Sequence, residues 1–99
     1  METPTRIYMV GIGGIGLSAY AAHMRSRGHE VFGSDRIDSA LIRDLKSQGI
    51  SITLNQDGSG IPDKIDLLVY SEAIPANTPE RALAAKKGIR QISYFAALG

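Results

Sequence analysis

The chain has 99 residues, with 11 lysines and arginines against 10 aspartates and glutamates, and it contains no cysteine. A chain of this length can form one domain around one hydrophobic core. The near-neutral charge gives no reason to expect nucleic-acid binding, and the lack of cysteine excludes disulfides and thiolate metal sites. No apolar run reaches the roughly 20 residues that a membrane helix needs, so we expect no membrane partner and no signal peptide.

Short apolar runs alternate along the chain with segments of helical periodicity. Leu17, Ala21 and Met24 recur at the spacing of three and four residues that marks the buried stripe of a helix. Ser39 can cap a second helix whose Leu41, Ile42 and Leu45 would face inward. Thr78-Pro79-Glu80 begins a third, with Thr78 as the cap and Glu80 at the positive end of the helix dipole. We expect strands at residues 6–10, 29–35, 50–54, 66–71 and 89–93, helices at about 14–27, 40–48 and 79–87, and the start of another element at 94–99.

The order of these elements predicts the fold class. Parallel strands need crossover connections, and right-handed crossovers produce an open sheet that is covered by helices on both faces. We therefore predict an α/β, Rossmann-like open parallel sheet of about five strands. Ligands of such sheets bind outside the carboxyl ends of the strands.

A glycine-rich stretch lies where the first predicted strand meets the first helix. Its residues fit the G-x-G-x-x-G pattern with one extra glycine: Gly11, Ile12, Gly13, Gly14, Ile15 and Gly16. In such a loop the first glycine makes the turn, the second lets the main chain approach a pyrophosphate, and the last lets helix pack on strand. The unpaired N–H groups of the following helix favour an anion. We expect this loop to bind a diphosphate.

Asp35 follows the second predicted strand, about 20 residues after the loop, where a carboxylate can accept hydrogen bonds from ribose hydroxyls. Arg36 is beside it and is either part of the site or solvated surface. NAD, a flavin and a sugar nucleotide all remain compatible with these features. Neither histidine has a second ligand at metal-binding spacing, so we assign no catalytic and no metal-binding residue.

Three blocks together resemble a known family. "GIGGIGLSAYA" (residues 11–21), "GHEVFGSD" (28–35) and "VYSEAIPANTPE" (69–80) are similar to the N-terminal domain of the Mur ligases. The resemblance covers residues 6–98 and implies that the domain binds UDP-N-acetylmuramate. It places the diphosphate on the glycine loop. It also assigns the following residues to the nucleotide site: Ser34, Asp35, Ser71, Ala73 and Ile74.

The sequence departs from the family pattern at a few positions. Glu72 stands where a second serine is usual, and we expect its carboxylate to point away from a diphosphate. Leu17 replaces a methionine, which is a change of little consequence. No histidine follows the third strand; Gln56 could supply a hydrogen bond to uracil in its place.

The chain contains no G-x-x-x-x-G-K-[ST] loop for ATP. The resemblance implies that ATP and Mg²⁺ bind a central domain, and that a C-terminal domain presents the amino acid. Residues 1–99 would then be a cytoplasmic, substrate-binding N-terminal domain that is inactive alone and needs no cofactor of its own. The residues of the third block favour the family member that adds L-alanine. A ligase that attaches a recycled peptide and an NAD(P)-binding domain are the alternatives.

Overall fold

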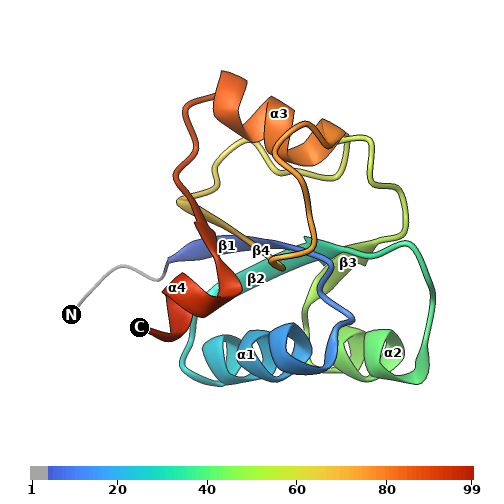
Figure 1. Cartoon of the computed structure of the whole chain (residues 1–99). Coiled ribbons are helices and arrows are strands. Elements are labelled where there is room, and N and C mark those ends of the chain that lie inside the picture. Colours follow the sequence, from blue (N-terminus) through green and yellow to red (C-terminus); the bar gives the residue numbers. More distant parts are fainter. Residues whose placement is uncertain (1–4) are drawn as a thin grey trace.

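The structure is a computed structural model that describes residues 5–99, and its centre is a fully parallel five-stranded sheet (Figure 1). Each strand pairs in register with its neighbours in the order β3-β2-β1-β4-β5. The strands are β1 (Arg6–Val10), β2 (Glu30–Ser34), β3 (Ser51–Thr53), β4 (Leu67–Tyr70) and β5 (Gln91–Ser93). The order reverses between β1 and β4, which makes this edge the topological switch point of the sheet.

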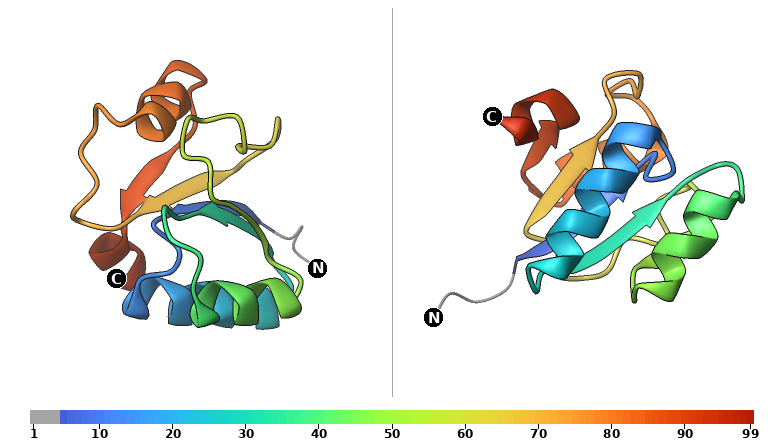
Figure 2. Two further views of the ribbon diagram at one scale, coloured as in Figure 1. Left: turned by 90° about the vertical axis from the view of Figure 1, so that its right-hand side faces the viewer. Right: turned by 90° about the horizontal axis from the view of Figure 1, so that it is seen from below.

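Helices cover both faces of the sheet, as the alternation of elements predicted. Figures 1 and 2 show α1 and α2 side by side on one face and α3 on the other. The fourth helix lies on the α1 side, where the ring of Tyr94 meets that of Tyr20 edge-on at a centroid distance of 6.1 Å. The helices are α1 (Ile15–Ser26), α2 (Ala40–Ser47), α3 (Pro79–Lys86) and α4 (Tyr94–Leu98). The predicted fold class is therefore confirmed.

The central strand β1 is buried on both of its faces, which explains its uninterrupted apolar sequence. Ile7 and Met9 point toward α1 and α2, and Tyr8 and Val10 point toward α3. Two apolar layers result, one on each side of the sheet. The loops that follow β1 and β4 therefore leave the sheet from strands that are packed on both faces.

The connection between β3 and β4 is an irregular segment, and its Ile61 fills the layer under α3. Two local predictions were wrong. Leu41 is 42% exposed, because Ile42 and Leu45 already fill the inward face of the short helix α2. Thr78 occupies the cap position of α3, but its hydroxyl donates to a preceding backbone carbonyl and does not cap the helix. The cap of α2 by a serine hydroxyl is confirmed.

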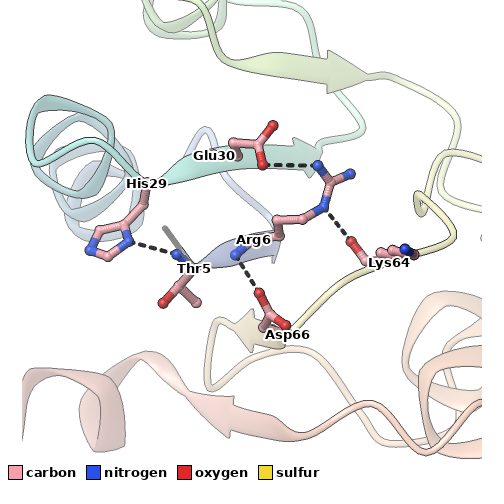
Figure 3. A network of polar contacts seen from close by, with 6 residues as sticks. All are labelled: Thr5, Arg6, His29, Glu30, Lys64 and Asp66. Carbon is pink, nitrogen blue, oxygen red and sulfur yellow. Dashed lines mark hydrogen bonds and ion pairs between the residues drawn. The ribbon is translucent and has the colours of Figure 1, made fainter. Parts of the chain in front are cut away.

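A network of polar contacts joins the starting ends of the strands, at the edge opposite the switch point (Figure 3). The backbone N–H of Arg6 donates to Asp66 Oδ2 at 2.8 Å, and its guanidinium donates to Glu30 Oε2 at 2.9 Å. His29 Nδ1 accepts a hydrogen bond from the N–H of Thr5 at 3.1 Å. These contacts tie β1 to β2 and to the segment before β4, and they occupy His29 in a structural role far from the glycine loop.

Candidate substrate-binding site

The glycine loop begins with the turn that the sequence predicted. Gly11 adopts φ +82°, a conformation that other residues rarely adopt, so the prediction that it makes the turn is confirmed. The N–H groups of Gly11 and Ile12 both donate to the carbonyl of Ser34, at 2.9 and 3.0 Å. The loop is thus attached to the end of β2 through its main chain, and these two amides are already paired.

The next amide of the loop is bound by an internal carboxylate. Asp35 Oδ2 accepts from the N–H of Gly13 at 2.8 Å, and Asp35 Oδ1 accepts from the N–H of Ile37 at 3.2 Å. A Cβ on Gly13 would lie 2.8 Å from Asp35 Oδ2 and 3.1 Å from Ile42 Cδ1. The open side of Gly13 therefore faces Asp35 and α2.

Further along the loop, the first turn of α1 presents unpaired donors. Among residues 5–99, the N–H groups of Ile15, Gly16 and Leu17 have no hydrogen-bond acceptor. Gly14 holds the N-cap position, and nothing caps the helix with a side chain. These amides point outward at the positive end of a 12-residue helix, an arrangement that favours an anion.

These donors open into a depression of about 310 Å³ between the ends of β1 and β4. A Cβ on Gly11 would lie 3.9 Å from Ser71 Cβ and 4.0 Å from Ile74 Cδ1, so the two loops meet directly across the switch point. The residues that line the depression are Gly11, Gly14, Ile15, Gly16, Leu17, Ser71, Glu72, Tyr94 and Phe95. Its lining combines glycines, apolar and aromatic side chains, the hydroxyl residue Ser71 and one acidic residue, Glu72.

The residues predicted from the sequence fall into three groups in space. Five of them line the depression: Gly11, Gly14, Ile15, Gly16 and Ser71. Two have buried side chains and can contribute only through their main chain: Ile12 and Ser34. The others lie around it, with Gly13 and Asp35 on the β2 side, Arg36 exposed next to them, and Ala73 and Ile74 in the loop after β4.

Four lining residues were not among the predicted site residues: Leu17, Glu72, Tyr94 and Phe95. Glu72 does not point away as expected: it lines the depression, and its Oε2 accepts from the N–H of Phe95 at 3.4 Å. Tyr94 and Phe95 start α4 directly after β5. Because all five strands are parallel, residues that follow β5 reach the same edge as those that follow β1 and β4. The predicted parallel arrangement of the strands thus contained a signal for both aromatic residues.

Gly16 has a different partner from the one predicted. A Cβ at this position would lie 2.9 Å from both Cε2 and Oη of Tyr94. The missing side chain makes room for an aromatic ring of α4, which closes one end of the depression. The expected contact between helix and strand is replaced here by a contact between helix and helix.

A buried carboxylate lies behind the glycine loop. Glu80, at 1% exposure, accepts hydrogen bonds from the hydroxyls of Tyr8 and Ser34, the latter at 2.6 Å. Gln56 Nε2 donates to Ser34 Oγ at 3.2 Å, so its amide is engaged in this network. Burial raises the pKa of Glu80, an effect that the two hydroxyl hydrogen bonds partly offset. Burial and the Glu80 contact likewise raise the pKa of Tyr8. The sequence had suggested only a dipole contact for Glu80.

The described residues do not fit ATP with Mg²⁺. The chain lacks the loop motif that binds the β- and γ-phosphates, and residues 5–99 contain no group of three or more histidines or carboxylates that could hold a metal. Nor does any helix in that range have the length and apolarity to cross a bilayer.

Fold and site together define a Rossmann-like α/β domain whose switch-point depression combines a glycine loop with an open helix N-terminus. The family model described as "Mur ligase family, catalytic domain" matches residues 6–99, so the chain belongs to the Mur ligase family. The predicted family membership is confirmed.

Individual relatives agree with this assignment. UDP-N-acetylmuramate–L-alanine ligase of Campylobacter jejuni is 37% identical over 92 residues, which cover 93% of this chain and 21% of the relative. The crystal structure of UDP-N-acetylmuramate-alanine ligase from Thermotoga maritima superposes with a TM-score of 0.89 at 30% identity, covering 94% of this chain and 21% of that one. The crystal structure of a murein peptide ligase from Psychrobacter arcticus superposes with a TM-score of 0.83 at 25% identity. The match covers 91% of this chain and 19% of that one. The chain spans about a fifth of the length of the curated relatives it matches.

Proposed function

We propose that this chain binds UDP-N-acetylmuramate, as the substrate-binding part of a ligase that adds L-alanine to it. The observation that carries the proposal is the depression at the switch point, where three unpaired amides of a Mur ligase family member lie within reach of the loop after β4. The identities of the substrate and of the added group are taken from the names of the relatives, which are UDP-N-acetylmuramate–L-alanine ligases.

The diphosphate would accept hydrogen bonds from the N–H groups of Ile15, Gly16 and Leu17, with the dipole of α1 behind them. Gly14 has no side chain that could cover these donors, and Ser71, whose Oγ accepts from the N–H of Ala73 at 3.4 Å, lines the opposite wall. Carboxylates lie on both sides of these donors, Asp35 on the β2 side and Glu72 in the loop after β4. Charge repulsion therefore favours neither side, and the unpaired amides of the first turn of α1 are what would hold the phosphates.

The uridine would extend from the diphosphate toward the β2 side, past Asp35 and Arg36. Asp35 already accepts two backbone hydrogen bonds, and a carboxylate has further lone pairs that a ribose hydroxyl can use. The muramate part would leave the depression in the other direction, past Ala73 and Ile74. This chain's own contribution is to bind and orient the substrate.

We assign residues 1–99 to an N-terminal domain of a longer, cytoplasmic enzyme. ATP and Mg²⁺ would be bound by the rest of that enzyme, because the residues of this chain do not fit them. Formation of the amide bond is likewise assigned to the rest of the enzyme, so the isolated chain should be inactive.

The main alternative is a ligase that attaches a recycled peptide. This alternative is suggested by the structural similarity of the chain to a murein peptide ligase, with a TM-score of 0.83. The higher identity and TM-score of the L-alanine ligase favour L-alanine. Assaying the full-length enzyme with L-alanine and with a tripeptide would separate the two.

NMR titration of the ¹⁵N-labelled chain tests the binding proposal. UDP-N-acetylmuramate and UDP should shift the amide signals of Ile15, Gly16 and Leu17, and NADH should bind more weakly than either. Tighter binding of NADH than of UDP would favour an NAD(P)-binding domain. Absence of shifts at these amides at millimolar ligand would contradict the proposal.

A matched pair of variants locates the site. Gly14→Val adds a branched side chain beside the unpaired amides, at a position whose φ of −63° and ψ of 150° accept valine. Ala19→Val adds methyl groups on the side of α1 that faces the groove toward α2. Gly14→Val should lose binding, and Ala19→Val should keep it.

A further inference from the structure

The first turn of α3 contacts both walls of the switch-point depression from behind. Its Glu80 side chain enters the layer between α3 and the sheet and accepts hydrogen bonds from Tyr8 on β1 and Ser34 on β2. Among residues 5–99, every buried side-chain nitrogen and oxygen has a partner, so this network is complete. A neutral apolar side chain of the same size would leave both hydroxyl protons without their acceptor in the core, although Ser34 Oγ would still accept from Gln56.

The network continues from Glu80 to the glycine loop. The hydroxyl of Ser34 binds Glu80, and the carbonyl of the same residue accepts the N–H groups of Gly11 and Ile12 at 2.9 and 3.0 Å. The position of Ser34 therefore sets the position of the loop that forms one wall. No side chain of the loop hydrogen-bonds to Glu80, and of its two partners, Tyr8 and Ser34, it is Ser34 that binds the loop amides.

The neighbouring residue holds the opposite wall. Arg81 Nη1 donates to the carbonyl of Ile74 at 2.9 Å, and Arg81 Nε donates to Gln91 Oε1 at 2.9 Å. Its guanidinium carbon lies 3.5 Å from the centre of the Tyr70 ring, a stacking contact that limits its orientation. The loop after β4 is thereby fixed to α3, β4 and β5 at once.

We propose that Glu80 and Arg81 are positioning residues that set the distance between the glycine loop and the loop after β4, and thereby the fit of the nucleotide-sugar substrate. The inference rests on the proposed function, since the substrate is the one proposed above. Neither side chain lines the depression, so neither is a binding residue. Their effect on affinity is transmitted through Ser34 and through the Ile74 carbonyl.

The test measures UDP-N-acetylmuramate affinity of the 99-residue chain by NMR titration, well below the melting temperature of each variant. Glu80→Gln and Arg81→Met should each weaken binding about tenfold, a coupling typical of residues in one network. Arg81→Lys, which keeps one donor, should recover part of the loss. Leu45→Ala and Ile50→Val are controls that remove buried apolar atoms on the other side of the sheet, and both should retain the wild-type affinity when folded.

A double variant separates transmission from general loosening. If Glu80 acts through Ser34, then Ser34→Ala combined with Glu80→Gln should weaken binding no more than the stronger single substitution. If the losses of affinity from the two single substitutions add fully in the double variant, transmission from Glu80 through Ser34 is contradicted. If Glu80→Gln does not fold, the affinities of Ser34→Ala and of the Arg81 variants test the inference instead.

Hydrogen exchange in the ligand-free chain gives a second readout. The amides of Gly11 and Ile12 should exchange faster in Glu80→Gln than in wild type, with unchanged exchange in the controls. Normal affinity and normal exchange in both Glu80→Gln and Arg81→Met would overturn the inference and leave the proposed function standing. If the wild-type chain binds no UDP-N-acetylmuramate, the proposed function fails. The role of Glu80 and Arg81 in substrate fit then fails as well, regardless of the hydrogen-exchange result.

Discussion

Gly13 and Gly14 are adjacent, yet the structure predicts different responses to the same substitution. A Cβ on Gly13 would lie 2.8 Å from Asp35 Oδ2 and 3.1 Å from Ile42 Cδ1, closer than side chains pack without rearrangement. The Asp35 carboxylate would have to move, and its 2.8 Å hydrogen bond with the Gly13 N–H would be weakened. A Cβ on Gly14 would meet only a backbone oxygen, Gly11 O, at an ordinary 3.5 Å.

The expected magnitudes follow from these contacts. Overpacking at Gly13 costs about 1–3 kcal/mol, and weakening a hydrogen bond to a charged group adds to it by up to about 1.5–3 kcal/mol. We therefore expect Gly13→Ala to lose about 2–4 kcal/mol of unfolding free energy. Gly14→Ala should change the unfolding free energy by less than about 1 kcal/mol, because φ −63° and ψ 150° suit alanine, and the lower entropy of the unfolded chain offsets alanine's weakness at the N-cap.

Thermal unfolding followed by far-UV circular dichroism measures both effects. For a domain of this size, each kcal/mol changes Tm by about 4–8 °C. Gly13→Ala should therefore melt about 8–32 °C below wild type, and Gly14→Ala should melt within about 8 °C of it. Urea unfolding with unchanged m-values would confirm that the folded state is responsible. Equal melting temperatures for the two variants would refute the reasoning from the Gly13–Asp35 contact.

Three further predictions concern other contacts of the site. Asp35→Ala should cost about 1–3 kcal/mol in urea unfolding, because the Gly13 amide loses its acceptor; an unchanged midpoint would show that water replaces the carboxylate. Gly16→Ala should cost about 1–3 kcal/mol by displacing the Tyr94 ring. The same substitution made in a Tyr94→Ala background should cost much less, and equal costs in both backgrounds would exclude the ring as the cause. Glu80→Gln should flatten the pH dependence of stability. Since the pKa of Glu80 is higher in the folded than in the unfolded state, its contribution to wild-type stability is complete below the unfolded pKa and is lost as pH rises through the folded pKa. Urea unfolding from about pH 4 to about pH 8 should therefore show the stability of wild type falling relative to Glu80→Gln, and parallel profiles would contradict the raised pKa.

The sequence by itself determined the fold class, the five strands and the turn at Gly11. These features depend on local properties: runs of β-branched and apolar residues, helical periodicity, and glycines where φ must be positive. The order of strands and helices then leaves few topologies open, so the meeting of the loops after β1 and β4 could be expected before any coordinates.

Only the tertiary structure decided what the individual polar side chains of the site contact. Glu80 looked like a dipole partner at a helix start, and its true partners, Tyr8 and Ser34, are distant in sequence. The ribose contact expected of Asp35 stays a prediction, and the tertiary structure adds that its carboxylate holds the amide of Gly13. A side chain's partner depends on which distant residues the packed sheet brings within about 3 Å, and no local pattern in the chain records that distance.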